Sequence, residues 1–373
     1  MTMMTRANDR SPIYLYDLNL PALTALLAKW GEPTYRARQL WEWLYIHLTT
    51  DFDAMTNLPR TLRTRLAAET IIDRPQIVDT LRSTDGETRK DLLQLSDGET
   101  IEVVLMRYTR RRTACISTQV GCSIGCPFCA TGQMGFRRNL RSGEIVAQVL
   151  HCAREWRAQG ERLSNVVLMG MGEPLLNSEA VFAALRRMTD ENGFRLGQRR
   201  ITLSTVGIVP GIVRLAELAE QPHSGLQITL AISLHAATDA LRNRLVPINR
   251  RYNLDTLFQA CHHYIQRTGR RVSFEWALIA GVNDSAIQAQ ALAARLVGMQ
   301  AHVNLIPLNP TDGYAGRPPA PADIETFTAV LERHHIPYTI RLRRGVDIQA
   351  SCGQLRQRSA AAGGGSSKNL SKS

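Results

Sequence analysis

The sequence contains no apolar run close to the roughly 20 residues that a membrane-spanning helix requires. Its first residues, MTMMTRANDRSPIY, hold no long hydrophobic stretch of the kind that marks a signal peptide. We therefore expect no membrane association and a cytoplasmic location. Because 44% of the 373 residues are hydrophobic, the chain can build one large domain or two unequal ones, which excludes disorder of the whole.

A regular cysteine framework is also missing. The chain has seven cysteines, an odd number, and is large enough to fold without stabilisation by disulfide bonds. Both facts argue against structural disulfides. Four of them lie within residues 115–129, and Cys352 stands near the C-terminus. This clustering indicates chemistry at a metal or redox site.

Acidic residues are few relative to basic ones, 33 against 45, which gives a net charge of +12 at pH 7. The excess lies beyond the first hundred residues, which are close to neutral. A basic surface suits a polyanionic partner such as nucleic acid, although it can also serve solubility alone. We interpret five basic segments together as phosphate contacts around the mouth of the fold, while any single one is more simply a solvated face. These segments are residues 107–112, 136–141, 198–200, 249–251 and 341–344.

The predicted elements change in character along the chain. Up to about residue 70, apolar residues recur at three- and four-residue spacing, which predicts helices. Residues 76–108 form short alternating runs separated by Asp-Gly, which predict hairpin strands. After residue 113, short strands alternate with helices about six times, which predicts parallel strands with helices outside. This alternation fits a barrel and an open doubly wound sheet equally well.

Small and polar residues stand where the predicted strands end. The stretches concerned are GMGEP, LSTVG, SLHAAT, AGVND and PLNP. Because α/β folds build their sites at the carboxyl ends of strands, we expect one site to which many strands contribute.

Three cysteines have the spacing C-x3-C-x2-C, in the loop directly after the first predicted core strand, TACISTQV. Thiolates at Cys122, Cys126 and Cys129 can hold three irons of a [4Fe-4S] cluster and leave the fourth open to a substrate. A structural zinc site would usually need a fourth ligand, and no second C-x-x-C pair follows. A thiol oxidoreductase motif normally opens a helix without a third nearby cysteine. The cluster is the favoured interpretation.

The cysteine motif resembles the signature of radical S-adenosylmethionine enzymes. Longer stretches resemble the RlmN family of adenine-C2 RNA methyltransferases, with similarity from residue 10 to residue 358. These are CISTQVGCSIGCPFCATGQMGFRRNLRSGEI, NVVLMGMGEPLLN, SLHAATDALRNRLVPINR and RGVDIQASCGQL. The resemblance implies an α/β fold with an incomplete (β/α)6 barrel, open on one side, behind a small N-terminal helical domain and a short β-hairpin linker.

We therefore predict five regions. They are a helical accessory domain at 1–70, a β-hairpin linker at 71–107, the core barrel at 108–347, a catalytic C-terminal segment at 348–358 and a disordered tail at 359–373. The tail is small, polar and glycine-rich, with too little apolar surface to order itself.

The resemblance also implies the chemistry. One [4Fe-4S] cluster and two molecules of S-adenosylmethionine per turnover are expected, one as methyl donor and one as radical source. Cys352 would accept a methyl group, which a radical then activates for addition to adenine C2. Cys115 would remove the C2 proton and release the product through a transient disulfide with Cys352. Glu102 matches a glutamate with a proton-accepting role, although from the sequence alone an exposed strand glutamate is the simpler interpretation.

The remaining implied contacts are those of S-adenosylmethionine. They are Gly172, Glu173, Ser204, Ser233, His235 and Asn309. Each alone is more simply a loop polar group, whereas together they form a coherent pocket. Cys152 and Cys261 lie on helical patterns, and we interpret them as packing residues.

The implied partners are 23S ribosomal RNA, transfer RNA and an electron donor such as flavodoxin or ferredoxin, and we expect a monomer. The nearest alternative is a related adenine-C8 methyltransferase, which shares the same cysteines. An RNA-binding protein with a structural metal site is the alternative from a different class.

Overall fold

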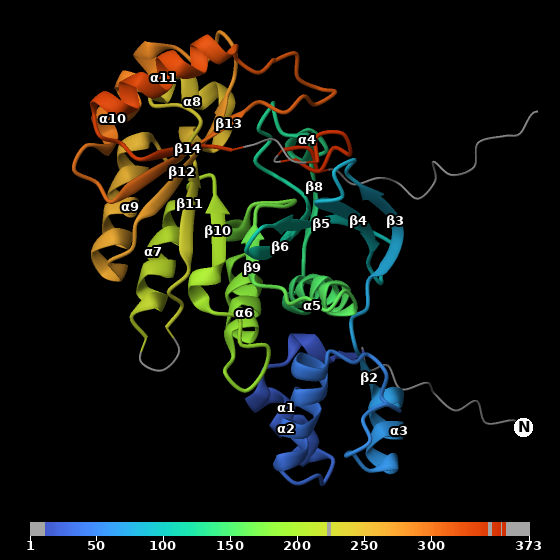
Figure 1. Ribbon diagram of the computed structural model, residues 1–373. Helices are drawn as coiled ribbons and strands as arrows, with labels where there is room; N and C mark the ends of the chain where they lie inside the picture. Colours follow the sequence, from blue (N-terminus) through green and yellow to red (C-terminus); the bar gives the residue numbers. More distant parts are fainter. Residues whose placement is uncertain (1–11, 222–224, 342–344, 352, 356–373) are drawn as a thin grey trace, which may run out of the picture.

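The computed structural model describes residues 12–221, 225–341, 345–351 and 353–355. A small helical unit comes first and lies beneath the rest of the molecule in Figure 1. Its elements are β1 (Ile13–Tyr14), a 3-10 turn (Leu15–Asp17), α1 (Leu20–Lys29), α2 (Tyr35–Glu42), a π-turn (Trp43–His47), α3 (Arg60–Glu69) and β2 (Thr70–Ile71). The predicted N-terminal helices are thus present.

A ten-stranded sheet forms the centre of the molecule, in the order β14-β13-β12-β11-β10-β9-β6-β5-β4-β3. The antiparallel part is β3 (Gln76–Arg82), β4 (Thr88–Gln94) and β5 (Thr100–Tyr108), which pairs with β6 (Arg111–Cys115). The parallel part continues from β6 through β9 (Asn165–Leu168), β10 (Ile201–Thr205), β11 (Thr229–Ser233), β12 (Val272–Leu278), β13 (Ala301–Pro307) and β14 (Tyr338–Ile340). Because β14 and β3 end the order without pairing to each other among the described residues, the sheet is an open, incomplete barrel.

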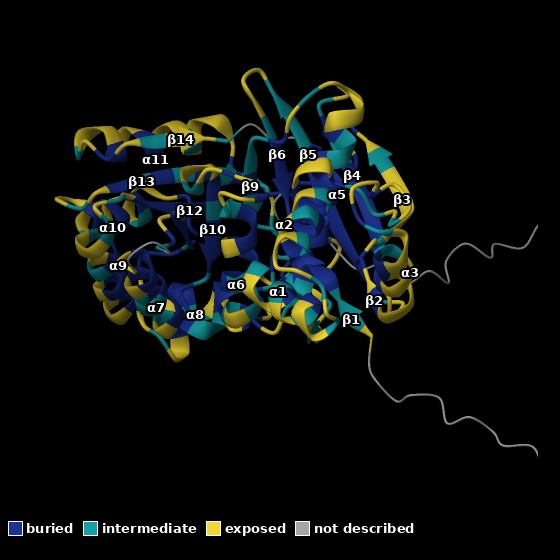
Figure 2. Cartoon of the chain, turned by 90° about the horizontal axis from the view of Figure 1, so that it is seen from below, coloured by how far each residue is buried: buried dark blue, intermediate teal, exposed yellow. Residues whose placement is uncertain are grey.

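Helices connect the parallel strands and cover the outside of the sheet (Figure 1). They are α5 (Ser142–Ala158), α6 (Ser178–Thr189), α7 (Val209–Ala219), α8 (Asp239–Leu245), α9 (Leu254–Thr268), α10 (Ala286–Leu296) and α11 (Pro321–Arg333). Short 3-10 turns lie at Pro174–Asn177, Gln198–Arg200 and Pro247–Arg250. Figure 2 shows buried strands enclosed by helices whose outer faces are exposed. The predicted alternation is confirmed, and β14 is an additional parallel strand. None of the described helices is long and apolar enough to cross a membrane.

The register of the strands separates two faces of the sheet. Residues directly opposite one another in neighbouring strands point to the same side. The pairs Ser204↔Ala231, Ser233↔Glu275 and Glu275↔Asn304 therefore put polar side chains of β10 to β13 on one face. The alternate residues, among them Leu203, Leu230, Phe274 and Trp276, are buried on the other face, toward the helices.

One predicted strand is divided in the structure. The stretch 113–120 was expected to be continuous, but β6 ends at Cys115 and a separate strand, β7 (Gln119–Gly121), follows. At Ser117 the backbone N–H donates to Gln148 Oε1 of α5, at 2.8 Å, and not to a neighbouring strand. The chain therefore leaves the main sheet, and β7 pairs with β8 (Phe136–Asn139).

The accessory unit is attached at the start of α5. Asp17 Oδ1 accepts hydrogen bonds from the Gly143 backbone N–H, at 2.6 Å, and from the Ser142 hydroxyl, at 2.9 Å. Arg141 forms ion pairs with Asp17 and with Asp73, the latter at 2.6 Å. A carboxylate at a helix N-terminus satisfies its free N–H groups, so this contact positions α5 against the accessory unit.

Candidate active site

One cavity lies at the carboxyl ends of the parallel strands, on the polar face of the sheet. The empty space in it is about 1100 Å³, which includes space open to solvent. The residues that line it include all three motif cysteines and all six residues expected to contact S-adenosylmethionine. They are Cys122, Cys126, Cys129, Gly172, Glu173, Ser204, Ser233, His235 and Asn309.

The cysteine loop is shaped by the β7·β8 hairpin and by α4 (Ala130–Gln133). The Cys122 backbone N–H donates to Gly135 O at 2.8 Å, and the Cys129 N–H donates to Cys126 O at 3.2 Å. Gly121 has a φ of 75°, and a Cβ there would lie 2.0 Å from Gly135 O, so only glycine fits. These contacts fold the three cysteines around one side of the cavity.

Burial disfavours the charged form of two thiols of this loop, those of Cys122 and Cys126. Burial raises the pKa of Cys122 to about 12 and that of Cys126 well above 9, with the neighbouring thiols adding to the effect on Cys126. The three thiols line one cavity and belong to one short loop, which is a donor set that can hold three irons of a [4Fe-4S] cluster.

Glu173 is buried in the loop that follows β9, and both of its carboxylate oxygens accept hydrogen bonds. Its Oε1 accepts a hydrogen bond from the Leu175 N–H at 2.9 Å, and its Oε2 accepts one from the Val206 N–H at 2.8 Å. Its own N–H donates to Gln119 Oε1 at 2.8 Å. Burial raises the pKa of Glu173 to about 7. A cationic group bound beside it would restore the charged carboxylate.

Ser204, Ser233 and His235 come from the next two strands. The hydroxyl groups of Ser204 and Ser233 lie 3.2 Å apart. His235 Nδ1 accepts a hydrogen bond from the Ala277 N–H at 2.9 Å, and the Phe128 ring packs edge-on against the imidazole at 5.0 Å. Burial lowers the pKa of His235 to about 3. The ring is therefore neutral and carries its proton on Nε2, which makes it a hydrogen-bond donor.

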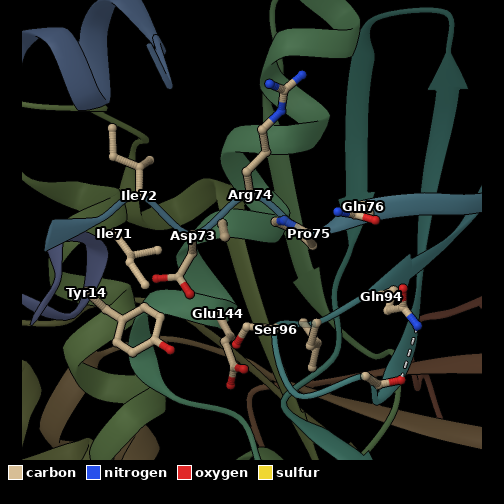
Figure 3. Close-up of a pocket in the computed structure, with 13 residues that line it drawn as sticks. Tyr14, Ile71, Ile72, Asp73, Arg74, Pro75, Gln76, Gln94, Ser96 and Glu144 are labelled. Carbon is tan, nitrogen blue, oxygen red and sulfur yellow. Dashed lines mark hydrogen bonds between the residues drawn. The ribbon is translucent and has the colours of Figure 1, made fainter. Parts of the chain in front are cut away.

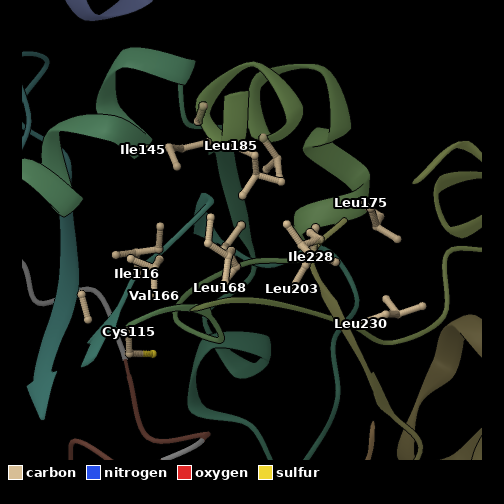
Figure 4. Close-up of a cluster of buried hydrophobic side chains, with 14 of the residues drawn as sticks. Cys115, Ile116, Ile145, Val166, Leu168, Leu175, Leu185, Leu203, Ile228 and Leu230 are labelled. Carbon is tan, nitrogen blue, oxygen red and sulfur yellow. The ribbon is translucent and has the colours of Figure 1, made fainter. Parts of the chain in front are cut away.

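Cys115 and Glu102 lie outside the set of residues that line the cavity. Cys115 ends β6, is buried, and lies opposite Val104 and Val167 of the neighbouring strands. Figure 4 shows Cys115 at the margin of the apolar cluster that includes Ile116. Glu102 on β5 is only 1% exposed and pairs with Lys90 Nζ at 3.1 Å. The simpler interpretation, an exposed strand glutamate, is wrong.

Cys352 itself and the tail at 359–373 lie outside the described residues. The residues after Cys352 are informative, because Gly353 and Leu355 line the cavity. Gly353 O accepts a hydrogen bond from the Ala130 N–H at 2.7 Å, and Leu355 O accepts one from the Thr131 hydroxyl at 2.6 Å. Residues 353–355 therefore lie against the cysteine loop.

Sequence reasoning missed Glu275, which lines the same cavity from β12. Its Oε1 accepts a hydrogen bond from Asn304 Nδ2 at 2.8 Å, and Arg341 lies 3.4 Å from its Oε2. Burial raises the pKa of this carboxyl group. The available signal was a single acidic residue inside the otherwise apolar strand VSFEWAL.

Two of the basic segments lie away from the mouth of the cavity. Residues 107–112 span the end of β5, the connecting turn and the start of β6, and Arg107 and Arg112 pair there with Glu161. Residues 198–200 immediately precede β10. Both segments are therefore at the amino ends of parallel strands, opposite the cavity, and the expectation that they surround it is wrong. Proximity to a strand in sequence does not say at which end of the sheet a residue lies.

A second cavity lies where the accessory unit meets the sheet (Figure 3). It is lined by residues that include Tyr14, Asp73, Gln94 and Glu144, and it contains none of the predicted site residues. Asp73 pairs there with Arg141. This cavity is part of the junction between the two units.

Comparison with known proteins agrees with this geometry. Residues 13–72 match the family described as "Ribosomal RNA large subunit methyltransferase N-terminal domain", and residues 116–291 match the "Radical SAM superfamily". The chain is 52% identical over 342 residues to "Dual-specificity RNA methyltransferase RlmN 1" of Myxococcus xanthus, covering 92% of this chain and 94% of that protein. The chain belongs to the RlmN family. The expected resemblance is confirmed.

A second RlmN-family relative and a solved structure support the assignment. "Probable dual-specificity RNA methyltransferase RlmN" of Chloroflexus aurantiacus is 49% identical over 357 residues, covering 91% of this chain and 92% of that protein. The "Crystal Structure of a radical SAM methyltransferase from Sphaerobacter thermophilus" matches with a TM-score of 0.89 and 51% identity, over 92% of this chain and 99% of that chain. The predicted fold class is thereby confirmed. Membership of a radical S-adenosylmethionine family implies an iron–sulfur cluster and S-adenosylmethionine.

Proposed function

We propose that this RlmN-family chain methylates C2 of an adenosine in the peptidyl transferase centre of 23S ribosomal RNA and of the adenosine beside the anticodon in transfer RNAs. The principal support is that one cavity is lined both by the three motif cysteines and by six residues from the ends of successive strands. Its relatives are named dual-specificity RNA methyltransferases. The net charge of +12 suits an RNA partner. An electron donor such as flavodoxin or ferredoxin and a monomeric state belong to the same proposal.

The residues of the cavity have separate roles in this proposal. Cys122, Cys126 and Cys129 would hold a [4Fe-4S] cluster. When bound, the cluster together with S-adenosylmethionine supplies the radical that activates the methyl group. The Glu173 carboxylate pairs with the ammonium group of S-adenosylmethionine, and Gly172 permits close approach of the backbone. Ser204, Ser233, His235 and Asn309 provide the remaining polar contacts.

Two further cysteines transfer the methyl group and release the product. The Cys352 thiolate displaces S-adenosylhomocysteine from one S-adenosylmethionine and forms the new sulfur–carbon bond. After the methyl carbon has joined adenine C2 and the C2 proton has been removed, the Cys115 thiolate attacks the Cys352 sulfur. The bond between that sulfur and the methyl carbon breaks, the carbon keeps the electron pair and takes up a proton, and the methylated RNA leaves while a Cys115–Cys352 disulfide forms. Reduction by an external thiol restores both cysteines. Cys115 is the proposed acceptor of the C2 proton, and Glu102 is proposed as a further proton acceptor in this reaction.

The first test is an anaerobic reaction of cluster-loaded protein with S-adenosylmethionine, a reductant and ribosomal RNA. Wild type is expected to produce 2-methyladenosine and 5'-deoxyadenosine by mass spectrometry of the digested RNA. Cys115→Ala is expected to remain covalently attached to RNA through Cys352, because the resolving thiol is missing. Cys261→Ala, which removes a buried packing thiol of α9, serves as the matched control and should turn over normally.

Two results would change the assignment. Formation of 8-methyladenosine would place the chain with the C8-methylating relatives. Binding of RNA without any cleavage of S-adenosylmethionine would mean that the metal site is structural, and the proposed reaction would be withdrawn.

A pH dependence follows from Glu173. Because burial raises its pKa to about 7, the carboxyl group takes up a proton as the pH falls through about 7 and can no longer pair with an ammonium group. The affinity for S-adenosylmethionine should therefore fall between about pH 7.5 and pH 5.5, where the ligand's α-amino group stays charged. Equilibrium binding measures this, and Glu173→Gln should bind weakly at every pH. Affinity that does not change with pH would remove Glu173 from this role.

A further inference from the structure

The segment that precedes Cys352 lies on the antiparallel extension of the sheet. Figure 1 shows the red C-terminal segment beside α4 and the β3–β5 extension. Asp347 Oδ2 accepts hydrogen bonds from the backbone N–H and from the hydroxyl of Thr84, both at 2.8 Å. Lys90 Nζ donates to Gln349 O at 3.0 Å. A Cβ on Gly345 would lie 2.9 Å from the Thr88 methyl group, so the two backbones are close. Residues 345–351 thus pack against the β3–β4 hairpin, and we call this contact the dock.

Lys90 has a second partner in this region. Its ammonium group lies 3.1 Å from Glu102 Oε1, and the two side chains are only 3% and 1% exposed. Lys90 on β4 is opposite Val104 on β5, and Glu102 is two residues before Val104, so all three side chains are on the same face of the sheet. Cys115 is opposite Val104 on the other side and shares this face. One ammonium group therefore joins the Glu102 carboxylate to the segment leading to Cys352.

A contribution to folding stability does not readily explain the buried ion pair of Lys90 and Glu102. A buried ion pair costs desolvation of both charges, and its replacement by packed apolar side chains is often neutral or stabilising. Removal of only one partner is damaging, because the other charge is left buried and uncompensated. An ammonium group is compact and has three donors, so it can bond a carboxylate and a backbone carbonyl at once.

We propose that Lys90 is a positioning residue that docks the segment preceding Cys352 and holds Glu102 as a charged carboxylate on the same face as Cys115. One side chain, that of Lys90, thereby positions both residues 345–351 and the carboxylate of Glu102. The part of this inference that concerns catalysis rests on the proposed roles of Glu102 and Cys352, whereas the docking of residues 345–351 does not.

The docking is tested by hydrogen exchange on the full, cluster-loaded chain. The reporters are the amides of Gln349 and Ala350, which donate to Val346 O at 3.0 Å and to Gly345 O at 2.8 Å. Lys90→Met combined with Glu102→Gln removes the bond to Gln349 O without leaving a buried charge, and wild type is its reference. Exchange at both amides should be about tenfold faster in the double variant than in wild type, since a lost anchor lowers local stability. Equal exchange in the double variant and in wild type would overturn the docking.

The link to catalysis is tested by turnover of the Lys90→Met variant. Its kcat for RNA methylation should fall by about 100-fold, as expected when a general base is lost, with KM for S-adenosylmethionine changed less than about threefold. Lys90→Arg should recover part of the rate because it keeps the charge. Asp347→Ala removes the acceptor of both Thr84 hydrogen bonds and leaves the Lys90–Glu102 pair intact, so it should accelerate exchange but lower kcat by less than about tenfold.

The outcomes separate the two proposals. A folded Lys90→Met variant with wild-type kcat would overturn the positioning role. If Lys90→Met does not fold, the double variant, which leaves no buried charge, is compared with wild type, and slower or unchanged exchange in the double variant would contradict the docking of residues 345–351. If wild type methylates no RNA, the proposed function and the catalytic role of Lys90 both fail, while the exchange data still decide the docking.

Discussion

Cys126→Ser is expected to lose its iron–sulfur cluster and all detectable RNA methylation. Cys126 is the middle cysteine of the motif, and its buried side chain lines the cavity. Among the described residues, no cysteine other than the three of the motif lines that cavity. A serine hydroxyl is a much poorer ligand for iron than a thiolate. Because adenine C2 is electron-poor, methyl transfer by a polar mechanism cannot replace the radical reaction when the cluster is lost.

Iron and sulfide content per chain and absorbance near about 400 nm measure the effect, since iron–sulfur clusters absorb there. Cys152→Ala, on the packed face of α5, is the matched control and should keep both cluster and turnover, at the cost of a small loss of packing. A Cys126→Ser protein that retained the cluster and turned over would show that the site is held by other ligands.

Gly172→Ala is expected to eliminate productive binding of S-adenosylmethionine. Gly172 has a φ of 97°, and a Cβ there would lie 2.5 Å from Gln119 Cβ and 2.8 Å from the Gln119 backbone N. Gln119 in turn accepts the hydrogen bond from the Glu173 N–H. The substitution therefore strains the backbone, by about 1–3 kcal/mol, and displaces the strand end that presents Glu173.

Binding titration and chemical denaturation test this prediction, with Gly197→Ala as the control. Gly197 has a φ of −60°, and a Cβ there would be 3.6 Å from Arg200 Cγ, which is ordinary contact. The control should change the free energy of unfolding by less than about 0.5 kcal/mol and leave binding intact. Equal behaviour of the two variants would mean that the conformation at Gly172 is not required.

Local patterns in the sequence determined the succession of elements and the principal site residues. Alternating and helical periodicities predicted β3 to β6 and the strands and helices from β9 to α11, because each follows from side-chain spacing over a few residues. The cysteine spacing and the polar strand ends predicted a common cavity, since parallel strands end at the same edge of a sheet. The three cysteines of that prediction line the cavity, together with the six residues that the family resemblance implied as contacts of S-adenosylmethionine.

Only the tertiary structure decided which residues meet across long distances in the chain. The break after Cys115 depends on Gln148 of α5, and the burial of Glu102 depends on Lys90 of the neighbouring strand. The contact of Lys90 with Gln349 joins residues 259 positions apart. Period-two alternation defines two faces of a strand but does not say which face lines the cavity or which end of the sheet a flanking arginine occupies. Strand register and the path of the connections settle both, because they place each strand against neighbours that are distant in sequence.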